Sequence, residues 1–139
     1  MKILILGAGR VGSSLASTLS KQDYEVSIVD LNKDKLLRLQ EDYDLATEIG
    51  HASHPNTLER AGADQDTILL AVTNSDECNI TSCQIAKSKF SVKKTICRLS
   101  DSSYLESLEA FGEKNIDIAI GPENEVTEHL VDLIFLEKL

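Results

Sequence analysis

Cysteine and positive charge are both scarce in this chain of 139 residues. It holds three cysteines, Cys78, Cys83 and Cys97, and no Cys-x-x-Cys pair, so a disulfide scaffold and a zinc site are both disfavoured. Lysine and arginine number 14 against 23 acidic residues. They are scattered along the sequence and the net charge is −9, which disfavours nucleic acid as a partner. Reduced, buried thiols at Cys83 and Cys97 fit a cytoplasmic protein.

Long apolar runs are absent as well. No stretch approaches the roughly 20 apolar residues that cross a bilayer, so we expect no membrane insertion. The apolar residues after Lys2 indicate a strand that leads into a glycine loop, and therefore not a signal peptide. The three histidines lack metal-ligand spacing. With 42% hydrophobic and 27% charged residues, the sequence is typical of one globular domain over residues 1–139.

Glycine is sparse too, yet three of the seven glycines form a Gly-x-Gly-x-x-Gly pattern at Gly7, Gly9 and Gly12. They follow the apolar run Ile3 to Leu6, which is typical of a strand buried on both faces of a parallel sheet. The first glycine permits a tight turn, the second lets the backbone approach a pyrophosphate, and the third lets the next helix pack closely on the strand. The pattern in this context indicates a dinucleotide-binding loop.

A helix is predicted to begin at about Arg10, because Val11, Leu15 and Leu19 repeat at helical spacing. Its N-terminal amides and its dipole would point at the phosphates of a nucleotide. The Arg10 guanidinium can pair with a phosphate there. The alternative is that Arg10 is a solvated arginine at the start of the helix.

The acid that completes the fingerprint is Asp30, which closes the apolar run Val26 to Val29. A carboxylate at the end of the second strand accepts hydrogen bonds from a ribose diol and repels a 2′-phosphate. We therefore expect NAD(H) or an adenine nucleotide to bind in preference to NADP(H). The alternative is that Asp30 only caps the helix that starts near Asn32.

Strand-like and helix-like segments alternate along the rest of the chain. Strands are predicted at 45–49, 67–72, 94–99 and 116–120, and helices for about ten residues after Asn32, at 55–61, 76–89 and 102–111, and from Pro122 onward. Six strands alternating with helices, without a hairpin signal, predict an α/β fold. We expect a Rossmann-like doubly wound parallel six-stranded sheet, order 3-2-1-4-5-6, with ligand at the carboxyl ends of the strands near the switch point.

The polar residues at those strand ends are the candidate site residues. They are Arg10, Asp30 and Asn32, the segment His51 to Ser53, the segment Thr73 to Glu77, and Arg98. Thr73 and Asn74 can hydrogen-bond a second ribose or a nicotinamide, whereas Ser75 or Asp76 is expected to cap the helix that follows. Arg98 ends a buried strand and needs an anionic partner, which is either a protein carboxylate or a ligand.

A catalytic arrangement is not recognisable in the sequence. A hydride-transferring dehydrogenase needs a further domain or long loops to hold its substrate, and this chain uses its length for the nucleotide fold. No Ser-His-Asp, Cys-His or lysine-based constellation is apparent. We therefore predict a regulatory domain and no enzyme. The alternatives are the nucleotide-binding domain of an NAD-dependent oxidoreductase that lacks its catalytic domain, and a nucleotide-dependent assembly module.

Several segments together carry a family resemblance. They are Gly7 to Ala16, Ile28 to Asp30, Ser53 to Pro55, Ala71 to Asn79, Ile96 to Leu99 and Gly121 to Glu123. These segments closely resemble the N-terminal nucleotide-binding domain (TrkA-N) of the RCK/KTN family of ligand-gated regulators, and the resemblance covers essentially the whole chain. The Ala-Val-Thr-Asn-Ser-Asp-Glu stretch is far more specific than the glycine pattern, which many dehydrogenases share.

The resemblance implies a cytoplasmic domain that binds NAD(H), or alternatively ATP, ADP or AMP. It also implies a homodimer or higher homo-oligomer that regulates the membrane subunit of a Trk-type potassium transporter, at the inner face of the plasma membrane. Full-length members carry a smaller C-terminal RCK domain in addition. That domain does not fit within residues 1–139, so we expect a shortened or a natural single-domain version.

By position, the resemblance also assigns parts of the nucleotide to residues. It assigns the phosphates to Gly7, Gly9, Arg10, Val11 and Gly12, the adenosine ribose to Asp30 and Asn32, the adenine edge to Ser53, and the distal part of the ligand to Thr73, Asn74 and Arg98. His51 and Ala52 depart from the family, which commonly has an acidic or amide residue followed by Gly or Ala at this turn.

The last helix is predicted to start at Pro122, with Glu123 and Glu125 complementing its dipole. Its core-facing stripe is expected to consist of Val126, Leu130, Leu133 and Ile134. Further apolar residues lie beyond that stripe, namely Val131, Phe135, Leu136 and Leu139. This surplus favours an interface with a second subunit, and the alternative is that the helix packs on its own domain.

Overall fold

The computed structural model describes residues 1–108 and 114–135 of the chain. Its six strands form one parallel sheet in the order β3-β2-β1-β4-β5-β6, which confirms the predicted Rossmann-like α/β fold. The strands are β1 (Lys2–Leu6), β2 (Glu25–Asp30), β3 (Ala46–Ile49), β4 (Thr67–Ala71), β5 (Lys94–Arg98) and β6 (Ile118–Ile120). The chain crosses from one half of the sheet to the other between β3 and β4, so β1 and β4 are neighbours at the switch point.

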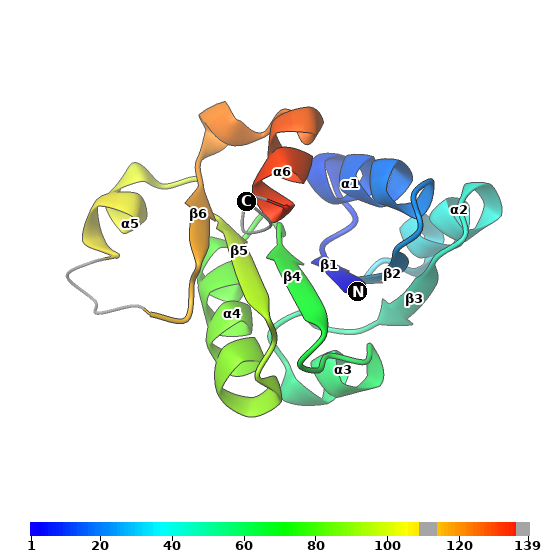
Figure 1. The fold of residues 1–139 in the computed structure, drawn as a ribbon, viewed down its shortest axis with the longest axis horizontal. Helices are drawn as coiled ribbons and strands as arrows, with labels where there is room; N and C mark the ends of the chain where they lie inside the picture. Colours follow the sequence, from blue (N-terminus) through cyan, green and yellow to red (C-terminus); the bar gives the residue numbers. More distant parts are fainter. Residues whose placement is uncertain (109–113, 136–139) are drawn as a thin grey trace.

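Helices cover both faces of this sheet, as Figure 1 shows. They are α1 (Arg10–Ser20), α2 (Lys33–Asp42), α3 (Pro55–Arg60), α4 (Asp76–Phe90), α5 (Ser102–Ser107) and α6 (Thr127–Ile134). Helices α1, α2 and α6 lie on one face, and α3 and α4 lie on the other. Within the described residues, none of these helices has the length and apolar character needed to cross a membrane.

Two apolar layers hold the helices to the sheet, because alternate residues of each strand point to opposite faces. In β1, Ile3 and Ile5 belong to the layer under α1, α2 and α6, and Leu4 and Leu6 belong to the layer under α3 and α4. All five residues of β4 are buried. The continuous apolar runs that predicted the strands therefore result from burial on both faces.

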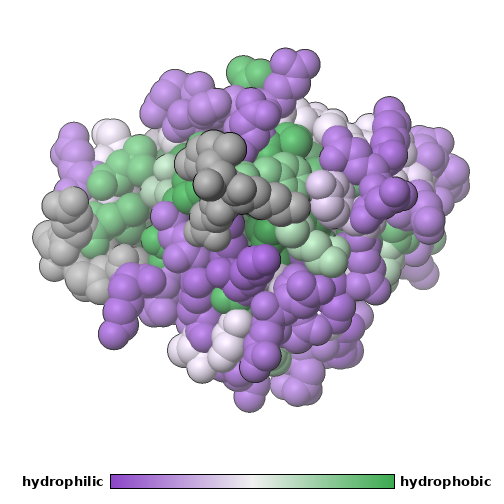
Figure 2. Space-filling view, viewed as in Figure 1, coloured by the Kyte–Doolittle hydropathy of each residue, from purple (hydrophilic) through white to green (hydrophobic). Residues whose placement is uncertain are grey.

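Figure 2 shows apolar surface over α5, at the left of this view. The helix has no fully buried residue, although Tyr104, Leu105 and Leu108 pack partly against the layer under α4. The predicted helix over 102–111 is confirmed for Ser102–Ser107, and its last residues lie outside the described ranges.

The prediction that the last helix starts at Pro122 is wrong. Residues Pro122–Asn124 form a separate 3-10 turn, and α6 begins only at Thr127. The Asn124 side chain accepts a hydrogen bond from the Gly121 amide at 3.0 Å and so closes the turn locally. This bond is the back-bond of a capping box, so it accounts for the start of the turn at Pro122, whereas the turn ends because Glu125 and Val126 leave the helical conformation.

This break also changes which residues of the last helix face the core. Val126 is in an extended conformation at the N-cap of α6 and its exposed fraction is 63%, so its predicted core position is wrong. Leu130 and Ile134 are buried, as predicted. Phe135 stacks on Tyr24 with ring centroids 5.2 Å apart. The described part of the apolar surplus thus packs on its own domain, and Leu136 and Leu139 lie outside the described residues.

A buried lysine fixes the C-terminal end of α6. Lys94 in β5 has an exposed fraction of only 2%, and its ammonium group donates to the carbonyl oxygens of Leu133 and Ile134 at 2.9 and 3.1 Å. Carbonyls in the last turn of a helix have no partner within the helix, and a cation complements the helix dipole there. The lysine therefore satisfies both carbonyls and ties α6 to the sheet.

We expect Lys94→Met to destabilise the domain by about 1–3 kcal/mol, since it leaves buried helix-end carbonyls without a donor. Chemical denaturation followed by circular dichroism measures the free energy of unfolding. Lys93→Met is the matched control, because the neighbouring lysine is exposed. Equal stability of the two variants would contradict the anchoring role of Lys94.

Candidate functional site

A cleft of about 720 Å³ lies at the carboxyl ends of the strands, where the switch point was predicted to place a ligand. Of the eleven residues predicted for the site, nine line this cleft: Gly7, Gly9, Arg10, Val11, Asp30, Ser53, Thr73, Asn74 and Arg98. Gly12 and Asn32 are not among the lining residues. The sheet order brings these residues together from β1, β2, β4 and β5 and from the segment after β3.

The glycine loop passes very close to neighbouring backbone. Gly7 has a φ of +106°, and a Cβ built on it would lie 3.0 Å from the Thr73 Cα at the end of β4. A Cβ on Gly12 would lie 1.7 Å from the Gly7 carbonyl oxygen. Side chains are therefore excluded at both positions by the fold itself, and Gly12 supports the site by letting α1 rest on the end of β1.

Gly9 differs from the other two glycines because nothing lies within 4 Å of the Cβ that it lacks. Its φ of −78° and ψ of −159° are open to any residue, so the protein fold does not require glycine here. Gly9 occupies the N-cap position of α1, and no side chain caps that helix. The open space and the N-terminal amides together form the kind of cradle that accepts a phosphate.

Asp30 is the last residue of β2, and its carboxylate accepts hydrogen bonds from two backbone amides. One oxygen accepts from the Ala8 amide at 2.7 Å, and the other accepts from the Asn32 amide at 2.7 Å. The first bond holds the glycine loop against β2. Each carboxylate oxygen can accept more than one hydrogen bond, so Asp30 keeps capacity for a ribose hydroxyl.

Asn32, and not Asp30, is the N-cap of α2. Its side-chain oxygen accepts from the amides of Asp34 and Lys35 at 3.0 and 3.2 Å. The alternative that Asp30 only caps this helix is therefore wrong, because the N-cap is the residue two positions later. Because Asn32 caps the helix and does not line the cleft, its role as a ribose ligand remains a prediction.

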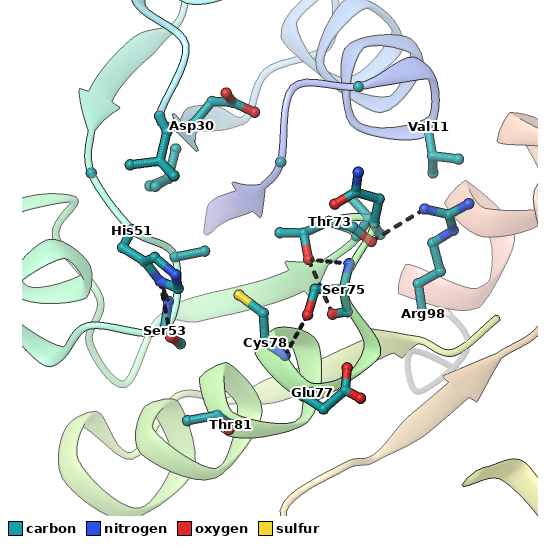
Figure 3. A pocket seen from close by; sticks show the side chains of 18 of the residues that line it. Val11, Asp30, His51, Ser53, Thr73, Ser75, Glu77, Cys78, Thr81 and Arg98 are labelled. Atoms are coloured by element: carbon teal, nitrogen blue, oxygen red, sulfur yellow. Dashed lines mark hydrogen bonds between the residues drawn. The ribbon is translucent and has the colours of Figure 1, made fainter. Parts of the chain in front are cut away.

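Figure 3 shows Asp30, His51 and Ser53 on one side of the cleft, and Val11 and Arg98 on the other. The His51 Nδ1 lies 3.0 Å from the Ser53 hydroxyl oxygen and 3.3 Å from its amide nitrogen. The opposite arrangement of acid and arginine gives the cleft two chemically distinct ends. We name them the acid end (Asp30, His51 and Ser53) and the arginine end (Arg10 and Arg98).

Asn79 organises the middle of the cleft, and sequence reasoning missed it. This fully buried amide accepts from the Thr73 amide and hydroxyl at 3.0 and 2.6 Å. It donates to the carbonyl oxygens of Thr73 and Arg98 at 3.1 and 2.9 Å. Asn79 lies four residues before Cys83 on the buried face of α4, and a polar residue on that face was the available signal. Its four bonds hold the ends of β4 and β5 together.

The two residues expected to cap α4 have structural roles. Ser75 is the N-cap, and its hydroxyl accepts from the Cys78 amide at 3.2 Å. The Asp76 carboxylate accepts from the amides of Ser100 and Asp101 at 2.8 and 2.9 Å, and so fixes the segment after β5. Asn74, in contrast, is exposed at the mouth of the cleft.

The anionic partner of Arg98 within the described residues is a protein carboxylate, Glu125. The Arg98 Nε donates to Glu125 Oε1 at 2.5 Å, and the Arg10 Nη2 donates to Oε2 at 2.8 Å. Burial alone would raise the pKa of Glu125, but the hydrogen bonds and charges of Arg98 and Arg10 outweigh it and lower that pKa below its usual value. Glu125 was expected to complement the dipole of the last helix; instead it joins the arginine end.

Comparison with known proteins places the sequence in a family. The model of the TrkA-N domain family matches residues 3–122. The chain is 44% identical over 137 residues to the Trk system potassium uptake protein TrkA of Vibrio alginolyticus, and 42% identical over 137 residues to that of Haemophilus influenzae. Each alignment covers 96% of this chain and 30% of the relative. The chain therefore spans less than a third of the length of these curated relatives.

Solved structures share the fold at lower identity. The NAD(P)-binding domain of an exopolyphosphatase-related protein from Archaeoglobus fulgidus matches with a TM-score of 0.74 at 19% identity, covering 99% of this chain and 98% of that one. The GsuK channel bound to NAD matches with a TM-score of 0.67 at 20% identity, over 86% of this chain and 21% of the channel. The Kef CTD of Shewanella denitrificans in its AMP-bound form matches with a TM-score of 0.69 at 23% identity, over 85% of this chain and 71% of that one.

The structural matches show the fold alone, whereas the family match rests on the sequence. It covers β1 through the start of the 3-10 turn, and so includes the glycine loop, Asp30 and Arg98. With this match and the identity to curated relatives, the chain belongs to the TrkA-N domain family.

Proposed function

We propose that this chain is the nucleotide-sensing domain of a Trk-type potassium-uptake system. In this proposal it binds NAD(H), or alternatively ATP, ADP or AMP, and passes its nucleotide state to the membrane subunit of the transporter. It acts from the cytoplasm as a homodimer or higher homo-oligomer. The relatives that support the transport role are named potassium uptake proteins, and this chain matches 30% of their length.

The observation that carries the proposal is the pairing of an unobstructed glycine loop with an acid at one cleft. Gly9 leaves open space at the uncapped start of α1, and Asp30 lies at the end of the neighbouring strand. Phosphates fit the first feature and a ribose diol fits the second. Both features support the binding of an adenine nucleotide, with its ribose at the acid end and its phosphates along the glycine loop.

The regulatory interpretation ranks above the oxidoreductase interpretation for two reasons. The relatives with 42–44% identity carry a potassium-uptake name, whereas a xanthine dehydrogenase and an anaerobillin reductase share the fold at 16% and 18% identity. The polar residues in the middle of the cleft are also engaged in structural bonds, since Thr73 and Ser75 hold the turn before α4. A nucleotide would act here as a signal, with no turnover.

We expect NADH to bind more tightly than NADPH, because the Asp30 carboxylate repels a 2′-phosphate. Asp30→Arg should reduce the difference in binding free energy between NADH and NADPH by about 1–3 kcal/mol, since it replaces a repulsion of the 2′-phosphate with a charge-assisted pair. Calorimetric titration with both dinucleotides measures the difference. Asp30→Asn is the control: it removes the charge and keeps an acceptor for the Ala8 amide. Tighter binding of NADPH by the unaltered chain would refute the assignment.

A side chain at Gly9 should block the nucleotide and leave the fold intact. We expect Gly9→Val to weaken NADH and ATP binding by more than about tenfold, or about 1.4 kcal/mol, because its branched Cβ fills the open space over the start of α1. The thermal midpoint should stay close to that of the unaltered chain.

Gly12→Ala is the contrasting variant, because its Cβ would meet the Gly7 carbonyl oxygen at 1.7 Å. It should lower the thermal midpoint measured by circular dichroism. A folded Gly9→Val variant that keeps full affinity would show that the phosphates bind elsewhere.

A further inference from the structure

Glu125 occupies an unusual place next to the cleft. Its carboxylate has a side-chain exposed fraction of only 9%, and each of its oxygens is bound by a different arginine. Arg10 comes from the first residue of α1 and Arg98 from the last residue of β5, while Glu125 follows the 3-10 turn. Both arginines line the cleft and Glu125 does not.

The bonds at Glu125 hold the two cations of the arginine end. Arg98 is mostly buried, with a side-chain exposed fraction of 19%, and also donates to the Thr73 carbonyl at 3.2 Å. Arg10 is exposed, with a side-chain exposed fraction of 73%. The pair with Arg98 is thus the stronger of the two, because solvent screens the exposed arginine. A phosphate that reaches this end would compete with the carboxylate for the same donors.

The length of the ligand decides whether it reaches the arginine end. In the proposed function, adenosine lies at the acid end and the first phosphates lie along the glycine loop. Figure 3 shows Arg98 across the cleft from Asp30, on the same side as Val11. A third phosphate would extend toward Arg98. A monophosphate would stop short of it, and a dinucleotide would place an uncharged nicotinamide riboside there.

We propose that Glu125 determines phosphate selectivity at this site, as an internal carboxylate that competes with a terminal phosphate for Arg10 and Arg98. The inference rests on the proposed nucleotide site. Glu125 weakens the binding of ligands whose terminal phosphate needs both arginines, and leaves shorter ligands and dinucleotides unaffected. The residue acts through the arginines and is therefore a positioning residue.

The competition also connects the cleft to α6. Glu125 directly precedes Val126, the N-cap of α6, whereas Lys94 holds the other end of that helix by its last carbonyls. A terminal phosphate that displaces Glu125 releases the first turn of α6 and leaves the last turn anchored. The effect of such a ligand on the backbone is thus expected at residues 125–130.

Glu125→Gln tests the proposal, with Glu123→Gln as the matched control. Both variants remove one negative charge from the same segment, but Glu123 is exposed and no arginine bond of the described residues involves it. Calorimetry with ATP, inorganic tripolyphosphate, AMP and NADH gives the affinities. We expect Glu125→Gln to bind ATP and tripolyphosphate about tenfold or more tightly than the unaltered chain, with AMP and NADH changed less than about twofold.

Three results would overturn the inference. They are unchanged affinity for ATP in Glu125→Gln, an equal gain for AMP and NADH, and an equal gain in Glu123→Gln. If the unaltered chain binds none of the adenine ligands while Glu125→Gln gains affinity for tripolyphosphate, the proposed function fails and the competition stands. If the unaltered chain binds adenine ligands and Glu125→Gln changes none of their affinities, the competition fails and the proposed function stands.

Hydrogen exchange of the unaltered chain provides a second test that does not depend on the folding of a variant. Saturating ATP should speed the exchange of amides in residues 125–130, whereas saturating AMP or NADH should not. Exchange in the last turn of α6, near Lys94, should stay constant in all cases. Identical exchange at residues 125–130 with ATP and with AMP would contradict the release of Glu125.

Discussion

The contact between Gly12 and the Gly7 carbonyl is the constraint on which the rest of the site depends. A Cβ at Gly12 would come within 1.7 Å of that oxygen, so α1 can rest directly on the end of β1 only with glycine there. This contact sets where α1 begins and therefore where its unpaired N-terminal amides point. It also leaves Gly9 as the open position between the two crowded glycines. The open space over the start of α1 is thus a consequence of how closely one helix packs on one strand.

Two polar side chains then join the strand ends that border this open space. Asp30 links β2 to the glycine loop through the Ala8 amide, and Asn79 links the ends of β4 and β5 through four hydrogen bonds. Asn79 is fully buried, and a buried hydrogen-bonding group needs such partners, whereas Asp30 is half-buried. The cleft is shaped by side chains that are already bonded to the backbone, so its walls are preorganised, which reduces the entropy lost on binding.

Local patterns predicted most of the fold. A strand that is buried on both faces is a continuous apolar run, and the apolar residues of a helix recur at a fixed spacing. The alternation of these elements predicted a parallel sheet, and the glycine fingerprint of a Rossmann-like fold predicted its strand order, which the structure confirms. The residues that were missed act at long range. Glu125 lies 115 positions from Arg10, and no short pattern connects them. The helix predicted from Pro122 stops after one 3-10 turn, and the next residue, Glu125, is bonded to Arg10 and Arg98, which are distant in the sequence.

The sequence alone did not decide whether the partner of Arg98 is a protein carboxylate or a ligand, and the chemistry of the guanidinium group explains why. A buried arginine requires an anion, and a carboxylate and a phosphate satisfy the same planar donors. Glu125 supplies that anion from a segment joined to α6, which the Lys94 ammonium holds at its other end. The charge that stabilises Arg98 within the fold therefore belongs to a segment that leads directly into a helix. Any ligand that replaces this charge must also change the restraint on that helix.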